Sequence, residues 1–171
     1  MKKCDPLAVA GSLTKQIRNG AFLTVKGVDA LNTMTIGWGL IGFIWQRKVF
    51  MVAVRDSRHT FTLMEKAKDF TVSVPSGDMK DALMFCGTKS GRDLDKFQAC
   101  GLTPVAAQET TSPVLQIPGI HLECVIRFKA PKDPKYLDIA LADLYPAKDY
   151  HTLYFGEIVA CYETGAQEEN P

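Results

Sequence analysis

The sequence has no apolar run long enough to cross a membrane. Its longest uncharged stretch, Ala30 to Gln46, contains three glycines and is shorter than the ~20 apolar residues that a spanning helix needs. We expect buried strand and loop there. The segment Leu7 to Ala10 is also too short for the apolar region of a signal peptide. These absences predict a cytoplasmic protein without a membrane partner.

Paired cysteines are missing as well. The chain has 5 cysteines, an odd number, and they are scattered without any C-x-x-C pair. A disulfide framework or a zinc site is therefore not expected. We expect reduced thiols and no bound metal.

The chain has almost no excess of charge of either sign. Its 20 basic and 19 acidic residues leave a net charge of +1, so no global field would attract a nucleic acid. Any bound anion must be held locally. A hydrophobic fraction of 46% in 171 residues is typical of one folded domain, which we place at residues 1–164, with a flexible tail at 165–171.

Strand-forming residues recur along the chain and predict a sheet-based core. In the clearest segment, Ile120–Lys129, apolar residues alternate with polar ones, which is typical of a half-buried strand with one wet face. His121 would lie on that wet face. The seven expected strands are Ala21–Lys26, Thr33–Trp38, Val49–Arg55, Phe70–Pro75, Ile120–Lys129, Leu137–Tyr145 and Thr152–Tyr162.

Helical spacing appears in the middle of the chain. Ser57–Lys68, with Ser57 as the cap, and a segment from Asp78 that ends at Gly87 both place apolar residues at i, i+3, i+4 and i+7. A weaker third helix, Asp93–Cys100, stops at Gly101. Strands at both ends with helices between them favour a mainly β fold, a largely antiparallel barrel with helical insertions.

The junction between the strand at Val49–Arg55 and the helix that follows could bind a phosphate. Unpaired N–H groups at a helix N-terminus favour anions, and arginine and hydroxyl side chains stand beside them. These are Arg55, Ser57, Arg58, His59 and Thr60. The alternative is an ordinary helix start with solvated arginines.

Two further segments could contribute to a site. The glycine-containing loop at residues 86–97 brings its backbone and Lys96 near an anion, although its spacing does not match a nucleotide triphosphate loop. The segment 32–39 places polar groups and Trp38 on an apolar strand, where they could flank a flat heteroaromatic ring. A solvated turn and a strand with a core tryptophan are the respective alternatives.

Four motifs, in this order, resemble the flavin reductase-like FMN-binding split-barrel family and, within it, the flavoredoxin branch. They are NTMTIGW, VRDSRHTFTL, CGTKSGRDLDKF and HTLYFGEI. The resemblance covers roughly Phe22 to Tyr162. It implies a split β-barrel and a homodimer that binds one FMN per subunit without a covalent link.

The resemblance also implies roles for individual residues. The flavin ring would be lined by Asn32, Thr33, Met34, Thr35 and Trp38, and the phosphate would be held by Arg55, Ser57, Arg58, His59 and Thr60. The later loop would contribute Cys86, Gly87, Ser90, Gly91 and Lys96, with Lys96 as a further charge on the phosphate. His151 would line the catalytic side of the flavin.

The leading hypothesis is therefore an oxidoreductase that takes electrons from NAD(P)H or another donor and passes them to an acceptor. The alternative is an FMN-binding electron carrier, like a flavoredoxin, without a pyridine-nucleotide site. A barrel that binds single-stranded nucleic acid would need a basic groove with aromatic residues, which a net charge of +1 does not favour.

Overall fold

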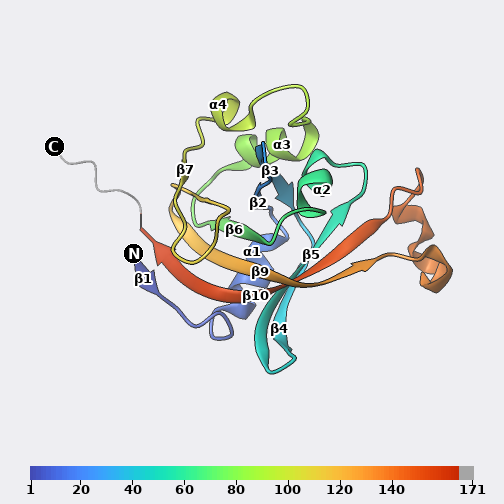
Figure 1. Ribbon diagram of the computed structural model, residues 1–171, viewed down its shortest axis with the longest axis horizontal. Coiled ribbons are helices and arrows are strands. Elements are labelled where there is room, and N and C mark those ends of the chain that lie inside the picture. Colours follow the sequence, from blue (N-terminus) through green and yellow to red (C-terminus); the bar gives the residue numbers. More distant parts are fainter. Residues whose placement is uncertain (166–171) are drawn as a thin grey trace.

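The computed structural model describes residues 1–165 and forms one curled antiparallel sheet with helices at its edges (Figure 1). Along the sheet the strands follow the order β3-β2-β6-β9-β10-β5-β4, and β1 pairs with β10. The bounds are β1 Lys2–Lys3, β2 Ala21–Lys26, β3 Leu31–Ile36, β4 Gly39–Ile44, β5 Arg47–Arg55, β6 Asp69–Pro75, β9 Gly119–Pro131 and β10 His151–Thr164, with a separate pair, β7 Pro104–Val105 and β8 Val114–Leu115.

The helices are short and lie mostly between β5 and β9 in the sequence. Figure 1 shows α2, α3 and α4 near the end of the sheet that holds β2 and β3. The bounds are α1 Ala10–Ile17, α2 His59–Met64, α3 Lys80–Thr88 and α4 Lys96–Cys100, and two 3-10 helices, η1 Pro134–Tyr136 and η2 Ile139–Leu144, precede β10. None of the helices among residues 1–165 has both the length and the apolar character needed to cross a membrane.

The barrel interior is the hydrophobic core. Phe50, Phe70 and Tyr154 are fully buried there, with Leu13 of α1 closing one end. The predicted mainly β, largely antiparallel fold is confirmed, and six of the seven expected strands are present with ends within a few residues. The tail expected at 165–171 lies, from residue 166 on, outside the described residues.

The prediction of a strand at Leu137–Tyr145 is wrong, because the 3-10 helix η2 occupies that segment. The Asp138 side chain accepts a hydrogen bond from the backbone N–H of Ala140 at 2.8 Å, which favours a helical turn over an extended strand. Ile139 is 86% exposed, so its β-branched side chain is not held in the sheet. The apolar residues at positions 139–144 are therefore not part of the core.

The segment 30–46, expected as buried strand and loop, contains a second strand that the sequence pattern missed. β4 pairs with β5 through a two-residue turn in which Trp45 and Gln46 have φ of 52° and 55°. Two positive φ values are the geometry of a type I′ hairpin turn, whose twist matches that of the strands. Leu40 and Phe43 on β4 are largely exposed.

The expected helices are present but begin later than predicted. Ser57 does not cap α2, because Arg58 is the cap residue and the Ser57 hydroxyl instead donates to Asp149 Oδ2 at 3.1 Å. Helix α3 continues through Gly87 to Thr88. Helix α4 ends at Gly101, as expected, in the left-handed conformation that favours glycine.

The prediction of a wet face on β9 is confirmed in the second half of the strand, where Arg127 is exposed, but it is wrong in the first half. Residues 104–117 pack over it, and Glu123, fully buried, accepts hydrogen bonds from the backbone N–H groups of Gln108 and Glu109 at 2.8 and 2.7 Å. His121 is 1% exposed and bonds to Ser73 Oγ at 3.0 Å. His121 and Glu123 are polar because they bind a covering loop, not because they face water.

Candidate functional site

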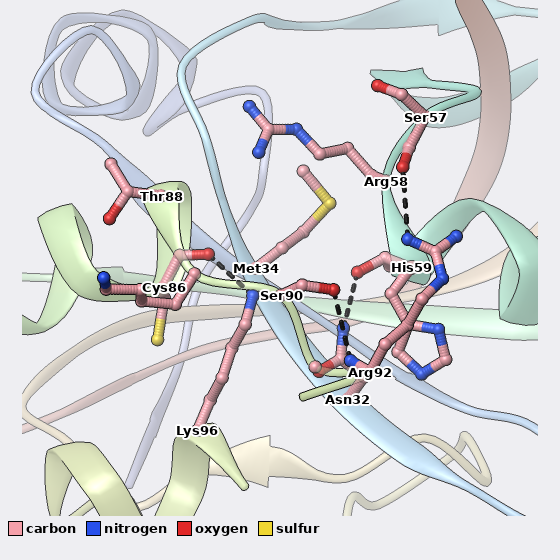
Figure 2. A pocket seen from close by; sticks show the side chains of 13 residues that line it. Asn32, Met34, Ser57, Arg58, His59, Cys86, Thr88, Ser90, Arg92 and Lys96 are labelled. Carbon is pink, nitrogen blue, oxygen red and sulfur yellow. Dashed lines mark hydrogen bonds between the residues drawn. The ribbon is translucent and has the colours of Figure 1, made fainter. Parts of the chain in front are cut away.

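A cavity of about 90 Å³ lies where β3, the start of α2 and the loop between α3 and α4 meet. All three sequence motifs that we considered for a site contribute to it. Figure 2 shows the basic side chains converging on this space. We call it the first cavity; its lining is Asn32, Met34, Ser57, Arg58, His59, Thr60, Cys86, Thr88, Lys89, Ser90, Gly91, Arg92 and Lys96.

Four cations at the first cavity lack a carboxylate partner among residues 1–165: Arg58, Lys89, Arg92 and Lys96. Three of them donate to a backbone carbonyl instead: Arg58 to Gly87 at 2.9 Å, and Arg92 to Ser57 at 3.3 Å and Lys96 to Cys86 at 2.8 Å (Figure 2). Lys96 is only 4% exposed, and burial lowers the pKa of its ammonium. Because carbonyls are dipoles and not counter-ions, the cavity keeps an uncompensated positive charge.

His59 adds an orphaned polar atom to the same cavity. Its Nδ1 is buried and has no hydrogen-bond partner in the described chain, which is uncommon for a buried polar group. Burial, and then the charges of Arg92 and Lys96, lower the pKa of His59. An anion in the first cavity would offer this ring nitrogen a partner and neutralise its cationic neighbours.

The wall of the first cavity is formed by a close approach of two segments. A Cβ added to Gly91 would lie 2.2 Å from Asn32 Oδ1, so only glycine lets this loop approach β3. Asn32 Nδ2 in turn donates to Thr60 Oγ1 at 2.8 Å. These contacts tie the loop, β3 and α2 together around the cavity.

Two larger cavities continue the first in a row along β3 and the chain after it. The second, about 190 Å³, shares Met34 and Arg58 with the first and adds Thr35, Trp38 and His151. The third, about 420 Å³, shares Trp38 and His151 with the second and is lined mainly by apolar side chains. The row therefore leads from a positively charged end, past an indole ring, to an apolar end.

Arg55 lies at the second cavity and not at the first. Its Nη1 forms an ion pair with Asp149 Oδ1 at 2.6 Å, and its Nη2 donates to the carbonyl of Leu144 at 2.9 Å. Its guanidinium also lies 5.2 Å from the centre of the Tyr145 ring. Asp149 neutralises Arg55, so this arginine holds the segment before β10 in place.

The other predicted residues divide between lining and support. All of the predicted residues except Thr33 and Gly87 line one or more of the three cavities. Thr33 lies on the opposite face of β3 from the core residues Met34 and Ile36, and its hydroxyl donates to the carbonyl of Leu23 at 3.3 Å. Thr35 Oγ1 donates to the carbonyl of Leu83 and so joins β3 to α3.

His151 joins the second and third cavities. It is 8% exposed, and its ring centre lies 4.7 Å from that of Trp38. Burial, and then the charges of Arg55 and Lys132, lower its pKa to about 4. The imidazole is therefore neutral near pH 7.

Sequence reasoning missed Arg92, Lys132, Tyr145 and Asp149. Arg92 stands in the glycine loop that the sequence singled out, so its charge was a signal that could have been used. The other three lie between β9 and β10, outside every motif. Their spacing gives no sign that the chain folds back beside Trp38.

A family model described as a flavin reductase like domain matches residues 17–171. A flavoredoxin of Desulfovibrio vulgaris (Miyazaki F) superposes with a TM-score of 0.68 at 22% identity, over 85% of this chain and 69% of that one. An FMN-binding protein from Thermus thermophilus, with bound 1-cyclohex-2-enone, gives 0.66 at 24% identity, over 84% and 69%. An NADH:FAD oxidoreductase of Streptomyces globisporus gives 0.66 at 17% identity, over 88% and 81%.

Proposed function

Because the chain belongs to the flavin reductase like family, we propose that it is an FMN-binding oxidoreductase that accepts electrons from NAD(P)H and passes them to an acceptor. The observation that carries the proposal is the first cavity, which four cations without carboxylate partners line together with His59, whose buried Nδ1 has no hydrogen-bond partner in the described chain. An FMN phosphate, which carries nearly two negative charges near pH 7, fits this donor set.

The row of cavities gives the cofactor an orientation. With the phosphate held by Arg58, Arg92 and Lys96, the ring would extend along Met34 and Thr35 toward Trp38. When bound, the flavin supplies the redox chemistry, and the protein supplies position and electrostatics. The neutral His151 would then lie at the ring, on the side of the third cavity.

The electron donor distinguishes this proposal from its alternative, an electron carrier without a pyridine-nucleotide site. The solved relatives include a protein named as an NADH:FAD oxidoreductase and one named as a flavoredoxin. The third cavity, next to Trp38 and His151, provides space for a second reactant, and we therefore favour the oxidoreductase.

The phosphate assignment is tested by titrating the protein with FMN and with riboflavin, which lacks the phosphate. We expect flavin fluorescence to be quenched by both, with FMN binding much more tightly and more weakly as salt is added. Equal affinity for the two flavins would contradict the assignment, and no binding of either would contradict the proposed function.

The donor is tested by mixing the FMN-loaded protein anaerobically with NADH and, separately, with NADPH. Bleaching of the flavin absorption within seconds supports the oxidoreductase. If neither nucleotide bleaches the flavin while dithionite does, the protein is a carrier.

A further inference from the structure

Three side chains between the end of β9 and the start of β10 form a hydrogen-bonded chain beside the third cavity. Lys132 Nζ lies 2.7 Å from the hydroxyl oxygen of Tyr145, and that oxygen lies 2.9 Å from Nδ1 of His151. The contacts bring residues 132, 145 and 151 together across the η1–η2 segment. No motif of the sequence included Lys132 or Tyr145.

The direction of each hydrogen bond follows from what each group can donate. An ammonium has only donors, so the Tyr145 oxygen must accept from Lys132. The single hydroxyl proton of Tyr145 is then free to point at His151, which makes Nδ1 the acceptor. A neutral imidazole that accepts at Nδ1 carries its proton on Nε2.

Nε2 of His151 is available to a ligand. It makes no hydrogen bond within residues 1–165, yet it is not among the fully enclosed polar atoms. His151 itself lines both the second and the third cavity, with the Trp38 ring 4.7 Å away. The N–H donor is therefore accessible at the two cavities, where a molecule beside the flavin would lie.

We propose that Tyr145, held by Lys132, is a positioning residue that fixes His151 as the Nε2–H tautomer, so that the site offers an uncharged donor to a carbonyl oxygen. The proposal rests on the proposed function, since it gives the second reactant its chemistry: a planar, uncharged group that bears a carbonyl or carboxamide oxygen. The carboxamide of a nicotinamide and the carbonyl of an aromatic aldehyde share this chemistry.

The lining of the third cavity supports this ligand class. Leu141, Leu144 and Leu153 give it an apolar wall suited to a flat ring. Its polar side chains are Thr14 and Arg18 together with the Lys132, Tyr145 and His151 chain. A carbonyl oxygen on a bound ring would find a fixed donor at His151.

The charges around His151 keep this donor neutral. Arg55 on β5, Arg58 before α2 and Lys132 after β9 disfavour a second proton on the ring, whereas Asp149 favours one. Lys132 also lies 4.2 Å from the centre of the Tyr145 ring, which orders the tyrosine. The cations outnumber the carboxylate, in agreement with the lowered pKa of His151.

The tautomer can be read directly by ¹⁵N NMR on FMN-loaded protein with labelled histidine. The chain has only 3 histidines, and His151→Gln assigns the relevant signals. We expect Nε2–H in the unsubstituted protein and a mixture of tautomers in Tyr145→Phe. Tyr150→Phe is the matched control, because its ring packs 5.0 Å from that of Tyr145 without a bond to His151.

An Nδ1–H tautomer in the unsubstituted protein, or an unchanged tautomer in Tyr145→Phe, would overturn the proposal. FMN affinity is measured on the same samples and should change less than about twofold, because Tyr145 does not line the first cavity. Protein that fails to bind FMN contradicts the proposed function, while the tautomer result still decides the hydrogen-bond chain.

The ligand class is tested with NADH, benzaldehyde and toluene on the FMN-loaded protein, with NADH added to the dithionite-reduced form. We expect the His151 Nε2–H signal to shift with NADH or benzaldehyde but not with toluene, which has no oxygen. Tyr145→Phe should weaken the responding ligand about three- to tenfold, the range for one neutral hydrogen bond. A shift with NADH alone would show that His151 binds the electron donor, and a shift with benzaldehyde alone would show that it binds the electron acceptor. No shift with either ligand would overturn the proposal.

Discussion

No carboxylate neutralises the cations at the first cavity, so we expect the charge of each to contribute to binding the FMN phosphate. Arg58→Gln and Arg92→Gln should each weaken FMN binding by about 1–3 kcal/mol, the range for a charge-assisted hydrogen bond. Riboflavin binding should change little. Fluorescence titration measures both affinities.

Lys80→Gln is the control for Arg58→Gln and Arg92→Gln. Lys80 is exposed, does not line the first cavity, and forms an ion pair with Asp78 at 3.9 Å. Arg55→Gln should affect FMN less than Arg58→Gln does, since Asp149 already neutralises Arg55 at 2.6 Å. An FMN affinity that responds to Arg55 but not to Arg58 or Arg92 would contradict the assignment of the first cavity.

The lowered pKa of His151 links the stability of the fold to pH. The unfolded chain takes up a proton near pH 6.5, but the folded chain does so only near pH 4. Between these values the unfolded state binds more protons, so the free energy of unfolding falls as the pH falls. A difference of 2.5 pKa units corresponds to at most about 3 kcal/mol.

His151→Gln should therefore show a smaller loss of stability between pH 6.5 and 4 than the unsubstituted protein. Urea unfolding at several pH values measures the difference. His59 and His121 also have lowered pKa values through burial, so some dependence should remain in the variant. Parallel profiles for the two proteins would show that His151 is not held neutral.

Among the elements, the loop between α3 and α4 is tied most tightly to the site. Gly91→Ala would place a Cβ 2.2 Å from Asn32 Oδ1, so either the loop or Asn32 must move. Overpacking of this kind typically costs about 1–3 kcal/mol of stability. We also expect weaker FMN binding, because Arg92 moves with the loop.

Gly77→Ala is the matched control, since nothing lies within 4 Å of an added Cβ there. Thermal unfolding and FMN titration of both variants test the contact. Equal behaviour of the two would mean that the close approach to Asn32 does not matter.

At the scale of the whole molecule, an exposed aromatic cluster fits a dimer interface, which we propose for this chain. Trp45, Phe128 and Phe155 pack edge to face or tilted, with ring centres 5.8–5.9 Å apart. Trp45 and Phe128 are each 49% exposed. A contiguous apolar patch of this kind marks an interaction surface.

Trp45→Lys and Phe128→Lys should shift the protein toward the monomer, because a charge would be buried without a partner. Sedimentation or light scattering measures the mass in solution. Val28→Lys is the control, since Val28 is 83% exposed and lies outside the cluster. A protein that is monomeric without any substitution would contradict the dimer.

The sequence alone predicted most strands, three of the four α-helices among residues 1–165, and the segments that meet at the first cavity, but it missed α1. Alternation and i, i+3, i+4 spacing report local burial, and local burial is what a strand or a helix requires. The resemblance to the flavin reductase-like family, drawn from four motifs, is confirmed by the family model that matches residues 17–171. The role of each predicted site residue stays a prediction.

Only the tertiary structure decided which distant groups pair. Asp149 pairs with Arg55, whereas Arg92 lines the first cavity. Asp149 and Arg55 lie far apart in the chain, so their spacing in the sequence does not show that they pair. Likewise, Tyr145 bonds to His151 because the η1–η2 segment folds back beside Trp38. Sequence periodicity shows on which face of its own helix or strand a residue lies. The partner of a side chain depends instead on which elements the sheet brings together.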